Sequence, residues 1–186
     1  MNQPVVPAAP GQSGRHGLQP LIRGTLLALY LALVLPLPLL APAGLRLPLL
    51  IALPLGALLV LAITSEQVHW DQQGLQVSLA PWCRWLPIRR SWQLQWQEIQ
   101  AITAVGTSQG GRVHYLRTGS GEAWLLPQRI TDFEVFLAQL SRATGLDTAG
   151  IGRLTPPWTY QLLALLCALM LVAELLAFAL YPGAVL

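Results

Sequence analysis

The residues best suited to recognition chemistry lie in one short stretch, 81–90. It combines indole rings with guanidinium groups, at Trp82, Arg84, Trp85, Arg89 and Arg90. Tryptophan settles among lipid headgroups and arginine pairs with phosphate, while the same residue types also dominate protein–protein hot spots. The stretch is therefore a candidate contact with a membrane interface or with a partner protein. In a third interpretation Trp82 and Leu86 pack into the surrounding domain and the arginines are merely solvated.

A second candidate is an acid inside an apolar segment. Glu174 is the single charged residue between Leu154 and the end of the sequence. An ionisable group within a membrane segment marks a functional site by default. It would pair with a polar group of a partner subunit or relay a proton. The alternative is that it lies near the outer face and either snorkels or stays protonated.

Enzymatic chemistry has little support. All eleven basic residues are arginines, which excludes a phosphate-loop lysine and a Schiff-base lysine. His69 and His114 come nearest to a catalytic pattern, yet no nucleophile motif accompanies them. Cys83 and Cys167 fall in different segments and have no metal-ligand spacing. We expect two free thiols, no metal, no cofactor and no enzymatic activity.

Charge is segregated along the chain, although the composition is apolar overall. Hydrophobic residues make up 54% of the sequence and charged residues only 10%, against roughly 25% in an average soluble domain. Residues 24–44 contain no charge, nor do residues 47–64. A bilayer demands this segregation, whereas a single globular core does not.

The segregation divides the chain into five parts. Residues 1–20 are predicted to be a disordered tail, 21–63 a transmembrane helical hairpin, 64–150 a cytoplasmic domain, 151–161 a linker and 162–181 a third transmembrane helix. Four prolines interrupt the hairpin, at Pro36, Pro38, Pro48 and Pro54. Because proline removes a backbone donor and bends a helix, a re-entrant hairpin that does not fully cross stays open as an alternative. Ala52 and Gly56 could form a close-packing seam.

The placement of arginine predicts the orientation. Arg15 and Arg23 precede the first apolar run and Arg153 precedes the last, whereas the hairpin tip holds only Arg46. Positive residues favour the cytoplasmic side. We therefore expect an integral protein of the bacterial inner (plasma) membrane with its N-terminus and middle domain in the cytoplasm. Another internal membrane, such as a thylakoid, is the alternative.

The middle domain is predicted to be strands followed by one helix. Alternating polarity predicts strands at 68–71, 75–79 and 91–97. Gln72–Gly74 is predicted to be a turn in which Gly74 takes a positive φ, and Gly119–Gly121 predicts a later hairpin. Thr131 and Glu134 have the spacing of a capping box. Four apolar residues then share one helical face: Phe133, Phe136, Leu137 and Leu140. Gly145 is placed as the C-terminal cap.

These elements resemble the bacterial PH-like (pleckstrin-homology-like) domain family of membrane proteins. The resemblance is carried by Trp96, Ile99 and Ile102 in a W-x-x-I-x-x-I strand, and by the hairpin that runs into Leu126-Pro127 and the helix 132–142. It implies an α+β membrane protein with a small antiparallel PH-like barrel closed by one C-terminal amphipathic helix. Eukaryotic PH domains bind phosphoinositides through basic residues in the first hairpin. Residues 70–74, taken as that hairpin, hold none, so phosphoinositide binding is not expected.

The sequence therefore predicts a non-enzymatic, membrane-anchored binding or scaffold module. Its expected partners are the lipid bilayer and either another membrane protein or a second copy of itself. Nucleic acid is not expected, because residues 64–150 contain seven arginines against seven acidic residues. The rival prediction is a small accessory or assembly subunit of a larger membrane complex, in which the helices provide the recognition.

Overall fold

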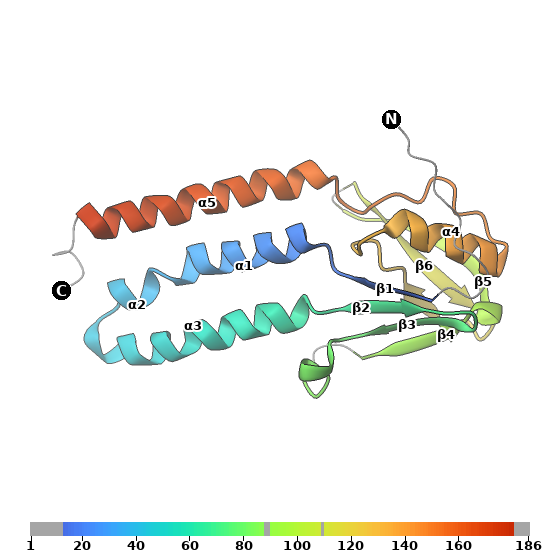
Figure 1. The fold of residues 1–186 in the computed structure, drawn as a ribbon, viewed down its shortest axis with the longest axis horizontal. Helices are drawn as coiled ribbons and strands as arrows, with labels where there is room; N and C mark the ends of the chain where they lie inside the picture. Colours follow the sequence, from blue (N-terminus) through green and yellow to red (C-terminus); the bar gives the residue numbers. More distant parts are fainter. Residues whose placement is uncertain (1–12, 88–89, 109, 181–186) are drawn as a thin grey trace. The chain divides into compact units, whose positions relative to one another are not determined.

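The chain forms two compact units in a computed structural model that describes residues 13–87, 90–108 and 110–180. One unit joins the described residues up to Gln19 with Ser65–Thr155, and the other joins Pro20–Thr64 with the chain from Pro156 onward. The first contains the strands and one helix, and the second contains the apolar helices (Figure 1).

The helical unit consists of α1 (Pro20–Val34), α2 (Leu37–Leu40), α3 (Ala43–Ile63) and α5 (Pro157–Leu180). Three segments are long and apolar enough to cross a membrane, Pro20–Leu40, Ala43–Ile63 and Trp158–Leu180. The helix α5 begins five residues before the predicted start. Pro36 stands between α1 and α2 and Pro38 lies in the first turn of α2, and neither residue can donate the backbone hydrogen bond of a continuous helix. Pro48 and Pro54 lie inside α3 without dividing it.

Within this unit α1 packs against both α3 and α5 (Figure 1). Tyr30 of α1 donates a hydrogen bond from its hydroxyl to the carbonyl oxygen of Leu53 at 2.8 Å. The same hydroxyl lies over Gly56, where a Cβ atom would collide with the phenol ring. Gly56 is therefore a close-packing position, as predicted, and its contact is with Tyr30 of the same chain.

The other unit contains two antiparallel sheets and is α+β, as predicted. The four-stranded sheet has the order β1 (Gly14–Gly17), β2 (Gln67–Trp70), β3 (Gly74–Ser78) and β4 (Trp92–Gln95). The three-stranded sheet has the order β5 (Ile99–Gly106), β6 (Arg112–Thr118) and β7 (Ala123–Leu125). A single 3₁₀ turn, η2 (Trp96–Glu98), connects β4 to β5, and its backbone is held by a reciprocal capping box between Gln95 and Glu98.

The strand β1 corrects the predicted tail. Residues 14–17 were assigned to a disordered segment but pair along their whole length with β2. The chain then continues into a second contact, where Gln19 and Thr131 donate backbone hydrogen bonds to Arg129 and Gly17 at 3.1 and 2.9 Å. The predicted domain 64–150 therefore omits one of its strands, and the α1–α3 segment is an insertion between β1 and β2. The part of the predicted tail at 1–12 lies outside the described residues.

The predicted turns are present, but one glycine has a different role. The carboxylate of Asp71 accepts hydrogen bonds from the backbone of Gln73 and Gly74 and stabilises the β2–β3 turn. Gly74 does not have the positive φ that the turn was expected to need. A side chain there would instead collide with the carbonyl oxygen of Leu94 on β4. Gly121, in the β6–β7 turn, does have a positive φ of 88°.

The helix α4 (Phe133–Thr144) closes the core. Its four predicted apolar residues are all buried, among them Phe136 at 0% exposure, and they pack with both sheets. Gly145 adopts the predicted left-handed cap, with φ of 71°. The capping box predicted for Thr131 and Glu134 is wrong, because the N-cap is Asp132 without a side-chain cap. Glu134 instead accepts two hydrogen bonds from Arg153.

Candidate functional site

The tryptophan- and arginine-rich stretch forms a compact turn between β3 and β4. It begins with η1 (Pro81–Cys83), in which Cys83 donates its backbone hydrogen to Ala80 at 3.0 Å. Leu86 then donates to the carbonyl of Cys83 at 3.0 Å. Proline starts this 3₁₀ segment well because its φ is already near the helical value and its missing donor is not needed there. We call residues 81–87 the Trp–Arg turn.

Cys83 anchors the Trp–Arg turn to the rest of the domain. Its side chain is fully buried, and its sulfur lies 2.9 Å from the hydroxyl of Ser65. The same hydroxyl accepts a hydrogen bond from the backbone of Ala80 at 3.3 Å. The sequence had predicted Cys83 only as a free thiol, and it contained no signal that would single out Ser65. Together the two residues hold the start of the turn against the segment that leads into β2.

The tryptophans of the turn point away from the core. Trp82 is 49% exposed and Trp85 is 78% exposed. The indole of Trp85 donates a hydrogen bond to the carbonyl of Trp82 at 2.9 Å, which fixes it across the turn. Against the interpretation in which Trp82 packs into the domain, about half of its surface is exposed, and Cys83 is the buried residue of the turn. An indole of such exposure is costly in water and suits an interface.

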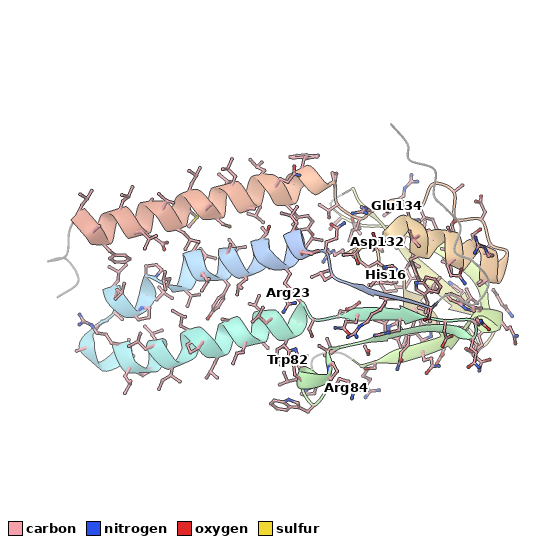
Figure 2. All side chains as sticks on the ribbon, viewed as in Figure 1. His16, Arg23, Trp82, Arg84, Asp132 and Glu134 are labelled. Carbon is pink, nitrogen blue, oxygen red and sulfur yellow. The ribbon has the colours of Figure 1, made fainter. Side chains whose placement is uncertain are left out.

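The two described arginines of the stretch, Arg84 and Arg90, line different cavities. Arg84 is exposed and lines a cavity on the outer face of the four-stranded sheet. Figure 2 shows Arg84 on the same turn as Trp82. Arg90 is also exposed but lines a different cavity, of about 240 Å³, with Trp92 and Trp124. Arg89 lies outside the described residues. The structure thus brings together Trp82, Arg84 and Trp85, and it separates Arg90 from them.

The position of the turn follows from sheet topology. In an antiparallel sheet with the order β1-β2-β3-β4, successive connections alternate between the two ends. The β2–β3 turn therefore lies at one end, and the β1–β2 and β3–β4 connections lie at the other. The β1–β2 connection is the inserted helical segment. Hence the Trp–Arg turn lies at the end of the sheet where the chain leaves for α1 and returns from α3.

The comparison with known proteins points to one family. No family model matches the sequence. Over 166 residues, 85% of this chain and 82% of the relative, it is 39% identical to "Uncharacterized protein slr0269" of Synechocystis sp. (strain ATCC 27184 / PCC 6803 / Kazusa). The chain belongs to the family of this cyanobacterial protein. The relative's name states no activity, so the site has to be interpreted from its own geometry.

Glu174 lies on the packed face of α5. Tyr160, Cys167 and Glu174 follow one another at intervals of seven residues and so share this face, on which Cys167 is 1% exposed. The carbonyl of Tyr160 accepts a hydrogen bond from Thr25 of α1 at 3.4 Å. Glu174 is half-buried, and its Oε2 atom is buried without a hydrogen-bond partner among the described residues. Such an oxygen in an apolar environment carries a desolvation cost of several kcal/mol unless it is protonated or paired.

The histidines are not arranged as a catalytic pair. His69 lies on the outer face of β2 and His114 is buried on β6, in the other sheet. Burial, followed by the nearby positive charge of Arg15, lowers the pKa of His69 below 6.5. His16 is buried on β1, with Nδ1 3.6 Å from the carboxylate of Asp132 (Figure 2). The described residues contain no group of three or more His, Cys, Asp or Glu side chains that could hold a metal.

Proposed function

We propose that this chain is a non-enzymatic, membrane-anchored binding module whose Trp–Arg turn rests on the surface of the bilayer. The observation that carries the proposal is the pair of exposed indoles, Trp82 and Trp85, on a turn that is fixed from beneath by Cys83. Indole and guanidinium side by side match the chemistry of the headgroup region.

Chain geometry supports this placement of the turn. The helix α3 ends at Ile63, and Ser65 follows only two positions later. Ser65 is hydrogen-bonded to Cys83 of the turn. Two residues span at most about 7 Å even when fully extended. If α3 crosses the membrane, Ser65 cannot lie far from the headgroups, and neither can the turn that it anchors.

The domain itself is proposed to be PH-like. Supporting this are seven strands in a four-stranded and a three-stranded antiparallel sheet, followed by one helix with a buried apolar face. Two residues of the W-x-x-I-x-x-I pattern, Trp96 and Ile99, are buried, and Ile102 packs against the same core. Because β1 precedes the helical insertion, residues 70–74 are the second hairpin of this domain rather than the first.

The proposed location is the cytoplasmic side of the inner membrane, or of another internal membrane such as a thylakoid. Arginine distribution supports this orientation. Arg23 lies near the start of α1 and Arg153 lies before α5, while the α2–α3 connection is followed by Arg46 alone. The domain and both of these helix starts would then share the arginine-rich side.

Fluorescence quenching tests the contact between the turn and the bilayer. The full chain is placed in anionic nanodiscs whose lipids carry bromine at the acyl positions nearest the headgroup. We expect the quenched share of tryptophan emission to fall when Trp82 and Trp85 are both changed to Phe. Trp124→Phe, in a half-buried residue of β7, is the control and should leave that share unchanged or larger. Equal quenching in the double variant and the native chain would rule out contact of the turn with lipid.

A second candidate function, an accessory subunit of a larger membrane complex, is favoured by Glu174. Its Oε2 has no hydrogen-bond partner among the residues that the structure describes, and a polar residue of another membrane protein would satisfy such a group on an apolar helix. Purification in mild detergent should then recover a stoichiometric membrane partner from native chain but not from Glu174→Leu. The control is Glu122→Leu, in an exposed residue of the sheet domain. Recovery of the same partner with Glu174→Leu would contradict this role of the acid.

A further inference from the structure

The outer face of the four-stranded sheet carries a groove that the proposed function does not use. The cavity has a volume of about 570 Å³. Strand register aligns four of its lining residues in a single row across the sheet, Arg15, His69, Gln76 and Gln93. Arg84 of the Trp–Arg turn lines the same cavity. We call this cavity the sheet groove.

The charge of the sheet groove favours an anion. Arg15 and Arg84 come from different parts of the chain, one from β1 and one from the β3–β4 turn. Among the described residues that line the groove, Asp71 is the single acid, and its carboxylate is occupied by the backbone of the β2–β3 turn. Burial, and after it the positive charge of Arg15, lowers the pKa of His69, which lines the same groove. Two arginines that line one groove, with no free carboxylate among its described lining residues, suit a phosphate group.

The remaining polar side chains favour hydroxyl groups on the same ligand. Gln67, Gln76 and Gln93 line the groove together with Ser78. The oxygen of Gln67 accepts a hydrogen bond from Arg15, which orients the guanidinium and leaves the amide nitrogen of Gln67 as a donor. Amides both donate and accept hydrogen bonds, as hydroxyl groups require. A polar outer face is normal for an antiparallel sheet, but a groove lined by two arginines from separate segments of the chain is an additional feature.

We propose that the sheet groove binds an anionic, hydroxyl-bearing group of the phosphoglycerol kind. This inference rests on the proposed function, since the Trp–Arg turn contributes Arg84 and would bring the groove near the headgroups. The phosphate pairs with Arg15 and Arg84, and the hydroxyls bond to the glutamine amides. Such a group comes either from a lipid headgroup or from a soluble phosphate ester.

Calorimetric titration of the full chain in phosphatidylcholine nanodiscs tests the site. The probes are inorganic phosphate, glycerol 1-phosphate, dihexanoyl phosphatidylglycerol and dihexanoyl phosphatidylcholine. We expect saturable binding of glycerol 1-phosphate and of dihexanoyl phosphatidylglycerol. Binding of inorganic phosphate should be weaker, and dihexanoyl phosphatidylcholine should not bind. Arg15→Gln combined with Arg84→Gln should weaken binding at least tenfold, while Arg112→Gln on β6 should not change it.

The source of the ligand follows from the two binding probes. Tighter binding of dihexanoyl phosphatidylglycerol indicates a lipid, and equal binding of glycerol 1-phosphate indicates a soluble ester. Bound anion should also raise the pKa of His69, because it offsets the charge of Arg15, and nuclear magnetic resonance of the imidazole reports this shift. Absence of binding by every anion, or binding that is the same in the double variant, overturns the proposal.

The single variant Arg15→Gln separates this site from the proposed function. Arg15 lies on β1 and not in the Trp–Arg turn. We expect this variant to lose probe affinity and keep the native quenching by brominated lipid. If the probes bind but brominated lipid does not quench Trp82 and Trp85, the contact between turn and bilayer is refuted and the anion site in the groove is supported.

Discussion

Arg15 donates a hydrogen bond to the side chain of Gln67, fifty-two residues further along the chain. The two residues lie on neighbouring strands, and the helices α1, α2 and α3 lie between them in sequence. The sheet is thus completed only when the chain returns from the helical segment. The pairing of β1 with β2 therefore joins the two ends of the helical segment α1–α3.

The first prediction concerns β1. A fragment Ser65–Thr155 leaves the edge of β2 and the indole of Trp70 uncovered, whereas a fusion of residues 13–19 to Ser65 through a short Gly-Asn linker restores the pairing. We expect the fusion to melt at least about 5 °C higher, the shift that roughly 1 kcal/mol produces in a domain of this size. Circular dichroism measures the melting temperature.

A clash variant is the control for this prediction. A side chain at Gly14 would collide with the indole of Trp70. The fusion with Gly14→Leu should therefore lose the gain in melting temperature. If fragment and fusion melt together, β1 does not stabilise the sheet.

The second prediction concerns the core face of α4. Phe136 is fully buried, and Phe136→Ala should lower the free energy of unfolding by about 3–5 kcal/mol, as large-to-small core changes do. Its neighbour Val135 is 37% exposed, and Val135→Ala should cost less than about 1 kcal/mol. Urea unfolding of the fusion protein compares the two variants. Equal losses would mean that α4 does not insert its Phe136 face into the core.

The third prediction concerns the contact between α1 and α3. In Gly56→Ala the new methyl group displaces the Tyr30 ring and its hydrogen bond to Leu53, and bonds of this kind contribute about 0.6 kcal/mol on average in membranes. The variant should unfold at lower dodecyl sulfate fraction in mixed micelles. Gly24→Ala, where a methyl group meets open space, is the matched control and should unfold as the native chain does. A stable Gly56→Ala would show that the two helices do not pack through this site.

The fourth prediction concerns Glu134 and Arg153. Two hydrogen bonds from Arg153 lower the pKa of Glu134 below 4.5, against the opposing effect of burial. The folded pKa lies below the unfolded value, so the stabilisation is present above about pH 4.5 and disappears as pH falls through the folded pKa. Arg153→Gln should raise the pKa of Glu134, which a carboxyl titration by nuclear magnetic resonance measures.

The size of this effect should be small. The Glu134 side chain is 57% exposed, and solvent-exposed ion pairs contribute at most about 1 kcal/mol. Arg112→Gln, on β6, serves as the control and should leave the titration of Glu134 unchanged. An unshifted carboxyl in Arg153→Gln would mean that the pair is not formed in solution.

The fifth prediction concerns topology. A reporter that is active only in the cytoplasm should be active when fused after Arg153 and inactive when fused after Leu186, because α5 is long and apolar enough to carry the chain across a membrane. The control is a variant with three arginines inserted in the α5 segment, which should then not span the membrane. The reporter fused after Leu186 of this variant should be active. Activity of both primary fusions would show that α5 stays on one side.

Local patterns determined most of the elements. Apolar runs long enough for a bilayer and almost free of charge predicted the three apolar helices. Period-two alternation predicted strands at 68–71, 75–79 and 91–97, close to the observed β2, β3 and β4. The apolar face of α4 and its cap at Gly145 also depend only on neighbouring residues, which is why a single sequence predicts them. The tryptophan- and arginine-rich composition likewise singled out the Trp–Arg turn.

Long-range contacts decided the rest. Gly14–Gly17 has two glycines in four residues and no local strand signal, so its pairing with β2 exists only because the chain returns from α3. The same holds for Ser65, which contacts Cys83, and for Glu134, which pairs with Arg153 and does not form the predicted capping box. The sheet groove likewise exists only because strand register aligns Arg15 with His69, Gln76 and Gln93. Each of these contacts joins segments far apart in sequence, and local propensity carries no information about such pairs.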